Sequence, residues 1–258
     1  SEGVYRGGRF EQPAAETFEH EGVFVAETVT NISGGEAVTD AICERYRKLY
    51  GGLVYDVLEH FGYPNQVVSH QIVPLEPGMK IAGPAFTVKG TMSCTRDEKI
   101  RYKRLVMIKE MRRPCVEVRD CGTPFPVALY GELSASSARA HGAVGALVDG
   151  GVRDCSHLIS MGFPVFSRYR NPVEAFGRWA LLEYQVPILI SGELTAALQV
   201  NPGDFIFGDY DGVLVIPAAL TMKVLEECER VKGIEDVARE EFARGEDPVG
   251  VFERHKRL

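Results

Sequence analysis

The chain has 258 residues, of which 45% are hydrophobic and 25% charged, and its formal net charge is −7. This composition is typical of a globular protein, and the length suffices for one large domain or two small ones. An acidic chain is a poor candidate for sequence-independent nucleic-acid binding, so we expect no nucleic-acid partner. The apolar runs are too short to cross a bilayer, and no secretory signal opens the sequence, so we expect no membrane association.

The six cysteines bear on the redox environment. None of them forms a CxxC pair, so the sequence offers neither a zinc knuckle nor a thioredoxin-type motif. In a chain of this length they are typical of reduced thiols, and we expect a cytoplasmic protein. We interpret Cys155 as a small packing residue, with a reactive thiol as the alternative.

The first fifty residues are predicted to form an N-terminal extension that ends in a helix. Residues 1–35 carry scattered Gly, Pro and Glu with little periodicity. Apolar residues then recur at helical spacing through residues 36–49, and a second helix is predicted over residues 53–61, where Gly62 and Pro64 stop it. The extension therefore covers residues 1–50.

Strands and helices alternate through the predicted core, residues 51–220. The predicted strands lie near residues 81–88, 115–118, 130–131, 143–148, 164–167 and 187–190. One helix is expected over residues 99–111, with Ile100, Leu105 and Ile108 on one side and the cations on the other. We interpret those cations as a solvated face, with an RNA or partner contact as the alternative. Another helix is expected over residues 134–141.

The last elements differ from the earlier ones. Residues 204–208 and 212–216 flank a turn and predict a β-hairpin. Pro217 is placed to open a C-terminal helix with a break or kink near Gly233, so residues 221–258 are predicted to form a helical arm. Alternating α and β elements followed by a hairpin favour a single-domain mixed α/β sandwich with a helical N-terminal extension.

Two glycine-marked junctions carry the candidate chemistry. At the first, Gly131 leads into a helix through Glu132, and the free N–H groups of a helix N-terminus suit a carboxylate or phosphate. The structural alternative is that Glu132 complements the helix dipole while Ser134 caps the helix.

The second junction follows after one helix and one apolar strand, in the run Asp149-Gly150-Gly151-Val152-Arg153-Asp154. Its two glycines favour a sharp turn and the close approach of a ligand. Arg153 is suited to hold a carboxylate or enolate oxygen, and Asp154 offers a hard oxygen ligand for Mg²⁺ or Mn²⁺. A surface ion pair between the two is the structural alternative. We expect the two junctions to meet in one cleft, which points to an enzyme.

Five motifs carry a family resemblance over roughly residues 50–220. They are Gly83-Pro84-Ala85-Phe86-Thr87-Val88, Gly131-Glu132-Leu133, Gly142-Ala143-Val144-Gly145, the Asp149–Asp154 run, and Gly162-Phe163-Pro164-Val165-Phe166. This set resembles the RraA-like family, which includes the class II 4-hydroxy-4-methyl-2-oxoglutarate / 4-carboxy-4-hydroxy-2-oxoadipate aldolases. The family's aldolase motif is an acidic residue, twenty residues and then Arg-Asp, a spacing that Glu132 and Arg153-Asp154 match. The fold it implies is a swivelling β/β/α type.

The resemblance also implies an activity and a site. The activity is that of a metal-dependent pyruvate aldolase, a lyase that cleaves a 4-hydroxy-2-oxo acid through a pyruvate enolate, with oxaloacetate decarboxylation as a second activity. Asp154 would bind Mg²⁺ or Mn²⁺, Glu132 would reach the metal through water, and Arg153 would contact the pyruvoyl oxygen. The backbone beyond Gly131, with the N–H groups of Leu133 and Ser134, would hold the substrate carboxylate.

The resemblance further implies a homotrimer or homohexamer with the cleft between subunits. A glutamate from a neighbouring subunit's C-terminal helix would complete the metal site. Glu235 is the best match, with Glu229 and Asp236 as alternatives.

Two positions depart from the aldolase pattern. Glu132 stands where the aldolases usually carry Asp, and His157 replaces an acidic residue. We interpret His157 as a surface histidine at a helix, with a new ligand or acid as the alternative. Three other functions stay open: a non-catalytic regulator of ribonuclease activity, a metal-dependent dehydratase or hydrolase of sugar acids, and a structural ring protein with a vestigial pocket.

Overall fold

The computed structural model describes residues 38–122 and 126–256. The irregular extension predicted for residues 1–35 lies outside the described residues. The chain divides into two units at Gly35, and the structure below concerns the described residues of the unit Glu36–Leu258. Within the described ranges, no helix has the length and apolar character needed to span a membrane.

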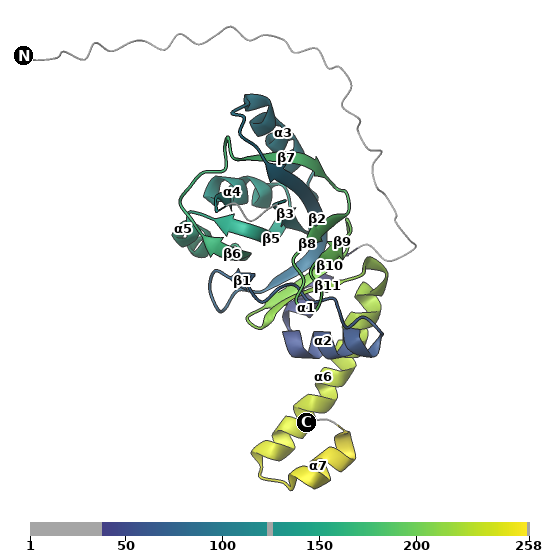
Figure 1. Ribbon diagram of the computed structural model, residues 1–258. Helices are drawn as coiled ribbons and strands as arrows, with labels where there is room; N and C mark the ends of the chain where they lie inside the picture. Colours follow the sequence, from purple (N-terminus) through teal and green to yellow (C-terminus); the bar gives the residue numbers. More distant parts are fainter. Residues whose placement is uncertain (1–37, 123–125, 257–258) are drawn as a thin grey trace, which may run out of the picture. The chain divides into compact units, whose positions relative to one another are not determined.

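A mixed sheet of nine strands is the frame of the described part of the chain (Figure 1). Its main path runs β1-β6-β5-β3-β2-β10-β11, while β4 pairs with β5 and β7 pairs with β2. The sheet strands are β1 (Val73–Pro74), β2 (Ile81–Met92), β3 (Cys115–Asp120), β4 (Ala128–Tyr130), β5 (Ala143–Val152), β6 (Val165–Arg170), β7 (Trp179–Tyr184), β10 (Phe205–Asp209) and β11 (Gly212–Ile216). A separate two-stranded sheet joins β8 (Ile188–Ile190) to β9 (Leu198–Val200).

The centre of the sheet is parallel, and this explains its sequence. Strand β3 lies between β2 and β5, and β5 also pairs in parallel with β4 and β6. Parallel strands are covered on both faces, so their sequences are continuous apolar runs rather than alternating apolar and polar residues. Strands β7 and β10 pair antiparallel with β2, β11 pairs antiparallel with β10, and β1 pairs antiparallel with β6.

Seven α-helices belong to the described residues. They are α1 (Asp40–Arg47), α2 (Gly51–His60), α3 (Glu98–Lys109), α4 (Glu132–Ala140), α5 (Cys155–Ser160), α6 (Thr221–Ala243) and α7 (Pro248–His255), and a 3₁₀ turn (Ala218–Leu220) precedes α6. Helix α4 follows β4 and packs on β5 and α5, as Figure 1 shows. This β4–α4–β5–α5 unit positions the candidate site.

A second hydrophobic core lies between α1, α2 and α6 and the strands β10 and β11. Tyr46 of α1 is fully buried there, and its ring stacks on Phe205 with 4.2 Å between centroids. The Tyr46 hydroxyl donates a 2.6 Å hydrogen bond to the carbonyl of Thr221, at the start of α6. Burying the ring and satisfying its hydroxyl together fix α1 against α6.

The prediction of a mixed α/β fold is confirmed, and so is the hairpin of β10 and β11. Of the break or kink predicted near Gly233, the break is wrong, because α6 runs unbroken through that residue to Ala243, while the kink stays a prediction. A helical glycine costs about 1 kcal/mol relative to alanine, which is too little to end a helix. The buried Val231 and the ion pair between Lys232 and Asp236 hold the helix on both sides of the glycine.

Candidate functional site

The first junction places Gly131 between β4 and α4. Gly131 has an extended backbone and caps α4, and Glu132 is the first helical residue. A Cβ atom at Gly131 would lie 2.7 Å from Oδ2 of Asp154 and 3.1 Å from Cγ of Arg153. A side chain at this position would therefore have to displace the Asp154 carboxylate and the Arg153 side chain from the first junction.

The second junction differs from its prediction. Strand β5 continues through Gly150 and Gly151 to Val152, so the two glycines make no sharp turn. A Cβ at Gly151 would lie 2.3 Å from the Tyr169 ring and 2.6 Å from the Val127 carbonyl oxygen, so close packing explains this glycine. The turn is made instead by Asp154, which has a left-handed backbone with φ of 57°.

The backbone of Asp154 is strained, and local hydrogen bonds hold it in this conformation. A left-handed conformation costs a residue other than glycine about 1 kcal/mol or more. The Asp154 carbonyl accepts hydrogen bonds from the backbone N–H groups of His157 (3.0 Å) and Leu158 (3.1 Å), which begin α5. Strained residues of this kind concentrate at functional sites.

The fold brings the two junctions together. The backbone N–H of Arg153 donates to the Tyr130 carbonyl (2.9 Å), and the backbone N–H of Glu132 donates to Oδ2 of Asp154 (3.2 Å). Nε of Arg153 lies 3.8 Å from the same Asp154 oxygen. The two side chains are 38% and 42% exposed, so this acid and this arginine are open to solvent and to a ligand.

The side chains of Glu132 and Ser134 point in directions that the sequence did not specify. The hydroxyl of Ser136 donates a 2.6 Å hydrogen bond to the Glu132 carboxylate, which orients that carboxylate along α4. The interpretation of Ser134 as the helix cap is wrong, because Gly131 occupies the cap position. Ser134 lies in the first turn, and its Oγ accepts a 2.9 Å hydrogen bond from Nη2 of Arg104.

A pocket of about 420 Å³ opens at these junctions. Its lining residues come mainly from α3, from β4 with the first turn of α4, from the second junction, and from the segment before β7: Ile100, Arg101, Arg104, Leu105, Ile108, Ala128, Leu129, Tyr130, Gly131, Leu133, Ser134, Ser137, Arg153, Asp154, Glu174, Ala175, Phe176 and Trp179. Three arginines thus share the pocket with two carboxylates. This excess of cations suits an anionic ligand.

Helix α3 contributes more to this pocket than its sequence predicted. Its cations were expected to form one solvated face, but Arg104 turns toward the pocket and Ser134. Leu105, expected on the buried side, is 54% exposed. Burial, followed by the charge of Arg119, lowers the pKa of Arg104 to about 10, so the guanidinium is still charged at neutral pH.

A buried ion pair in β3 lies behind Arg104, and sequence reasoning missed it. Glu117 and Arg119 are fully buried. Arg119 donates from Nε to Glu117 Oε1 (2.7 Å) and from Nη1 to the Leu129 carbonyl (2.6 Å), and its guanidinium lies 4.9 Å from the Tyr130 ring centroid. Burial, followed by the Glu117 charge, raises the pKa of Tyr130 well above its usual value. The available signal was two charged residues at alternate positions of a buried strand.

Cys155 and His157 lie on α5, next to the junction. Burial raises the pKa of the Cys155 thiol, so the thiol is protonated at neutral pH. This favours the interpretation of Cys155 as a packing residue. His157 is exposed, in keeping with a surface histidine.

The carboxylates at the two junctions are the candidate ligands of a divalent metal ion. Within residues 38–122 and 126–256, no group of three or more His, Cys, Asp or Glu side chains is arranged to hold a metal ion. Asp154 lines the pocket, and its exposed carboxylate suits Mg²⁺, which is bound in many enzymes by one or two carboxylates, with water and substrate completing the shell. Glu132 is not among the residues that line the pocket, and its carboxylate accepts the hydrogen bond from Ser136 instead. The chain by itself therefore provides part of such a site.

The three candidates for a carboxylate from a neighbouring subunit lie on α6 and do not line the pocket of this chain. Glu235 accepts hydrogen bonds from the Tyr50 hydroxyl and from Nη2 of Arg239 (2.8 Å). Glu229 pairs with Arg45 (2.6 Å), and Asp236 pairs with Lys232 (2.6 Å). That one of them completes a neighbour's metal site stays a prediction.

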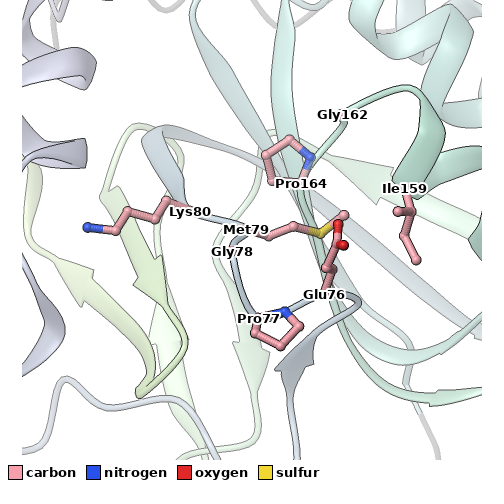
Figure 2. A pocket seen from close by; sticks show the side chains of 8 residues that line it. All are labelled: Glu76, Pro77, Gly78, Met79, Lys80, Ile159, Gly162 and Pro164. Carbon is pink, nitrogen blue, oxygen red and sulfur yellow. The ribbon is translucent and has the colours of Figure 1, made fainter.

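A second hollow, of about 630 Å³, lies elsewhere on the chain (Figure 2). Its charged lining residues are Glu76 and Lys80. Figure 2 shows the Lys80 side chain pointing away from Glu76, and its Nζ is bound to the carbonyls of Arg47 (3.0 Å) and Leu49 (2.6 Å). With its cation already bound, this hollow lacks the convergent charges of the first pocket.

Together, these features define an α/β protein with a parallel central sheet and an arginine-rich pocket at two strand–helix junctions. Residues 37–215 match the RraA-like family, described as Aldolase/RraA. The chain belongs to this family.

Individual relatives are similar at modest identity. Protein DlpA of Legionella pneumophila is 29% identical over 194 residues, which cover 74% of this chain and 30% of that protein. This chain therefore spans about a third of that relative's length. A Halalkalibacterium halodurans protein named "Putative 4-hydroxy-4-methyl-2-oxoglutarate aldolase" is 30% identical over 172 residues, or 66% of this chain and 74% of that one. A crystal structure from work on cellulases of gut-associated microbes is 32% identical with a TM-score of 0.72, and the match covers 79% of this chain and 90% of that one.

Proposed function

We propose that the protein is a divalent-metal-dependent lyase that cleaves a carbon–carbon bond of a 4-hydroxy-2-oxo acid and releases pyruvate, a class II pyruvate aldolase. The observation that carries the proposal is the meeting of Arg153, Asp154 and the N-terminus of α4 in one open pocket. The relative named as an aldolase supports the same chemistry.

The pocket provides a binding site for the 2-oxo acid end of such a substrate. Helix α4 begins at Glu132, so the backbone N–H groups of Leu133 and Ser134 are among the first four, which have no partner within the helix. These donors and the helix dipole suit the substrate carboxylate. Arg153 then lies on the same side as the neighbouring keto oxygen and donates to it.

Bond cleavage places negative charge on that keto oxygen. Arg153 is a fixed positive donor for this charge, and a preorganised donor of this kind is worth about 10²–10³-fold in rate. A water held by Glu132, whose carboxylate is oriented by Ser136, takes the proton from the 4-hydroxyl group. Among the described residues that line the pocket there is no lysine, so the proposal does not use a Schiff base.

The metal requirement is part of the proposal. Asp154 and Glu132 would hold Mg²⁺ or Mn²⁺, and a bound divalent cation supplies Lewis-acid stabilisation of charge on the keto oxygen. Loss of CO₂ from oxaloacetate gives the same enolate, so we also propose oxaloacetate decarboxylation. A homotrimer or homohexamer in the cytoplasm, in which Glu235, Glu229 or Asp236 of one subunit reaches the pocket of the next, completes the proposed site.

Other functions of the family and of its relatives fit the pocket less well. A non-catalytic regulator of ribonuclease activity has no need of a strained, exposed Asp154 beside an arginine. Cellulose hydrolysis uses two carboxyl groups around a neutral sugar, whereas three arginines favour an anion. A sugar-acid dehydratase would use the same charges, and its product separates it from a lyase.

Pyruvate release tests the proposal. The purified full chain is supplied with 4-hydroxy-2-oxo acids and with oxaloacetate, with Mg²⁺ or after chelation, and pyruvate is detected through lactate dehydrogenase. We expect release that requires the metal. A folded protein that yields no pyruvate from any of these substrates, or yields a dehydrated product instead, contradicts the proposal.

A further inference from the structure

Two of the three arginines in the pocket lie at the end where the two junctions meet. Arg153 belongs to the second junction, next to Asp154. Arg104 donates from Nη2 to Ser134 Oγ (2.9 Å), in the first turn of α4. Because Ser134 also carries one of the free backbone N–H groups of that turn, Arg104 lies beside the site proposed for the 2-oxo acid carboxylate. Both arginines are therefore assigned to the pyruvoyl end of a substrate.

The third arginine, Arg101, is already neutralised by acids of this chain. It lies about one helical turn from Arg104 along α3. Its guanidinium lies 3.5 Å from Glu98 and 3.6 Å from Glu174, and it stacks 4.1 Å from the Phe176 ring centroid. Two acids against one cation leave this part of the pocket with an excess of negative charge. Because like charges repel, a second carboxylate of a ligand is disfavoured here.

Large apolar side chains form much of the remaining wall of the pocket. They come from α3, from α4 and from the segment that leads into β7: Ile100, Leu105, Ile108, Leu133, Phe176 and Trp179. Leu105 is 54% exposed and Leu133 is 80% exposed, so both present apolar surface to solvent at the pocket. An apolar group of a ligand would remove this surface from water, which is favourable. The volume of about 420 Å³ leaves room for such a group beside the pyruvoyl end.

We propose that this apolar wall binds the substituent on C4 of the substrate, and that the substituent is an uncharged, apolar group. This inference rests on the lyase function proposed above. Arg104 and Arg153 bind the pyruvoyl end, whereas Leu105 and Leu133 contact the other end and Glu174 repels a carboxylate there. The preferred substrates are therefore 4-hydroxy-2-oxo acids with one carboxylate, which are cleaved to pyruvate and an apolar aldehyde.

A pair of substrates with the same shape tests this preference. In 4-hydroxy-5-methyl-2-oxohexanoate an isopropyl group replaces the distal carboxylate of 4-hydroxy-2-oxoglutarate, and its cleavage gives pyruvate and 2-methylpropanal. Coupled pyruvate release in the presence of Mg²⁺ measures kcat/KM for both. We expect the wild-type chain to favour the isopropyl substrate about 10-fold or more, because burial of the apolar group is favourable and the second carboxylate is repelled.

Variants of two pocket residues assign the preference to the proposed wall. Leu105→Ala should lower kcat/KM for the isopropyl substrate about 3- to 10-fold, mainly through KM, because apolar contact is lost, and should change it less than about 2-fold for the dicarboxylate. Glu174→Gln should raise kcat/KM for the dicarboxylate about 3-fold and have little effect on the isopropyl substrate, because a like charge is removed. Tyr102→Ala is the matched control, since Tyr102 is an exposed residue of α3 that does not line the pocket. Melting temperatures check that each variant is folded.

The outcomes separate this inference from the lyase function. Equal kcat/KM of the wild-type chain for the two substrates, or a preference for the dicarboxylate, would overturn the inference. So would unchanged kinetics in Leu105→Ala, or equal losses for both substrates. If the wild-type chain releases no pyruvate from any substrate, the lyase function fails, and binding then decides the inference.

Binding can be followed through Trp179, the one tryptophan of the chain, which lines the pocket. Its fluorescence is titrated with 5-methyl-2-oxohexanoate and with 2-oxoglutarate, which differ in the same way as the two substrates but lack the 4-hydroxyl group. Tighter binding of the first compound that is weakened in Leu105→Ala supports the inference. Equal binding of the two compounds, tighter binding of 2-oxoglutarate, or no binding of either compound overturns it.

Discussion

The helical layer of α1, α2 and α6 and the pocket beside α3 and α4 both combine arginines with carboxylates, but they use them differently. In the helical layer, Arg45 donates twice to Glu229, at 2.8 and 2.6 Å, so both partners are satisfied. In the pocket, Arg153 lies 3.8 Å from Asp154, and Nε of Arg104 has no acceptor within the described chain. Satisfied pairs hold helices together, whereas incompletely satisfied pairs retain capacity for a ligand.

The largest effect on activity is expected when Asp154 or Arg153 is replaced. Asp154→Asn and Arg153→Ala should each lower the rate of pyruvate release about 10³-fold, while the melting temperature changes little because both side chains are substantially exposed. Asparagine is chosen because it tolerates the left-handed backbone of Asp154 better than alanine does. Glu44→Gln on α1 is the control for loss of a carboxylate, because Glu44 pairs with Arg47 and does not line the pocket. Turnover at the wild-type rate in either pocket variant would refute the assignment.

The next effect concerns the buried pair of β3. Arg119→Leu leaves Glu117 buried without its partner and should lower the free energy of unfolding by about 3–5 kcal/mol. The double variant Glu117→Leu/Arg119→Leu removes both charges and should recover most of that loss. Denaturant unfolding of the single and double variants measures the difference. If the double variant is no more stable than Arg119→Leu, the two charges are not coupled as the structure indicates.

A smaller effect on stability is expected from replacing glycines, and it should differ between two positions. Gly151→Ala should destabilise the fold by about 1–3 kcal/mol, because its Cβ would lie 2.3 Å from the Tyr169 ring. Gly52→Ala in α2 meets no atom within 4 Å and should be neutral or stabilising by up to about 1 kcal/mol. Thermal unfolding compares the two. Equal tolerance at both positions would contradict the close packing at β5.

The smallest effect lies in the helical layer. The hydrogen bond from Arg45 lowers the pKa of Glu229, so the stabilisation is present above the unfolded-state pKa and is lost as pH falls through the folded-state pKa. Glu229→Gln should therefore cost about 0.2–1 kcal/mol at pH 7, a small amount because this pair is partly exposed, and the difference from wild type should be smaller at pH 3. Urea unfolding at both pH values measures the change. A pH-independent difference would assign the effect to packing instead of charge.

The two junctions of the site could be predicted because their geometry is local. A strand, a helix and a parallel return strand bring Glu132 and Asp154 to the same end of the sheet, and the spacing alone specifies this. The position of Arg104, turned toward the pocket, could not be predicted in the same way. Helical periodicity assigned every α3 cation to solvent, and the inward turn of Arg104 depends on Ser134, thirty positions further along the chain. The left-handed backbone of Asp154 also follows from tertiary contacts rather than from the glycines before it.

Exchange of the pyruvate methyl protons for deuterium tests the central claim most directly, because it reports enolate formation whatever the full substrate is. With Mg²⁺ in deuterated buffer, proton NMR should show loss of the methyl signal with the wild-type chain. In Arg153→Ala and Asp154→Asn the exchange should be slower by about 10²-fold or more, since the charge on the keto oxygen is no longer stabilised. Exchange at the wild-type rate in both variants, or its absence with the folded wild-type protein, would contradict the account.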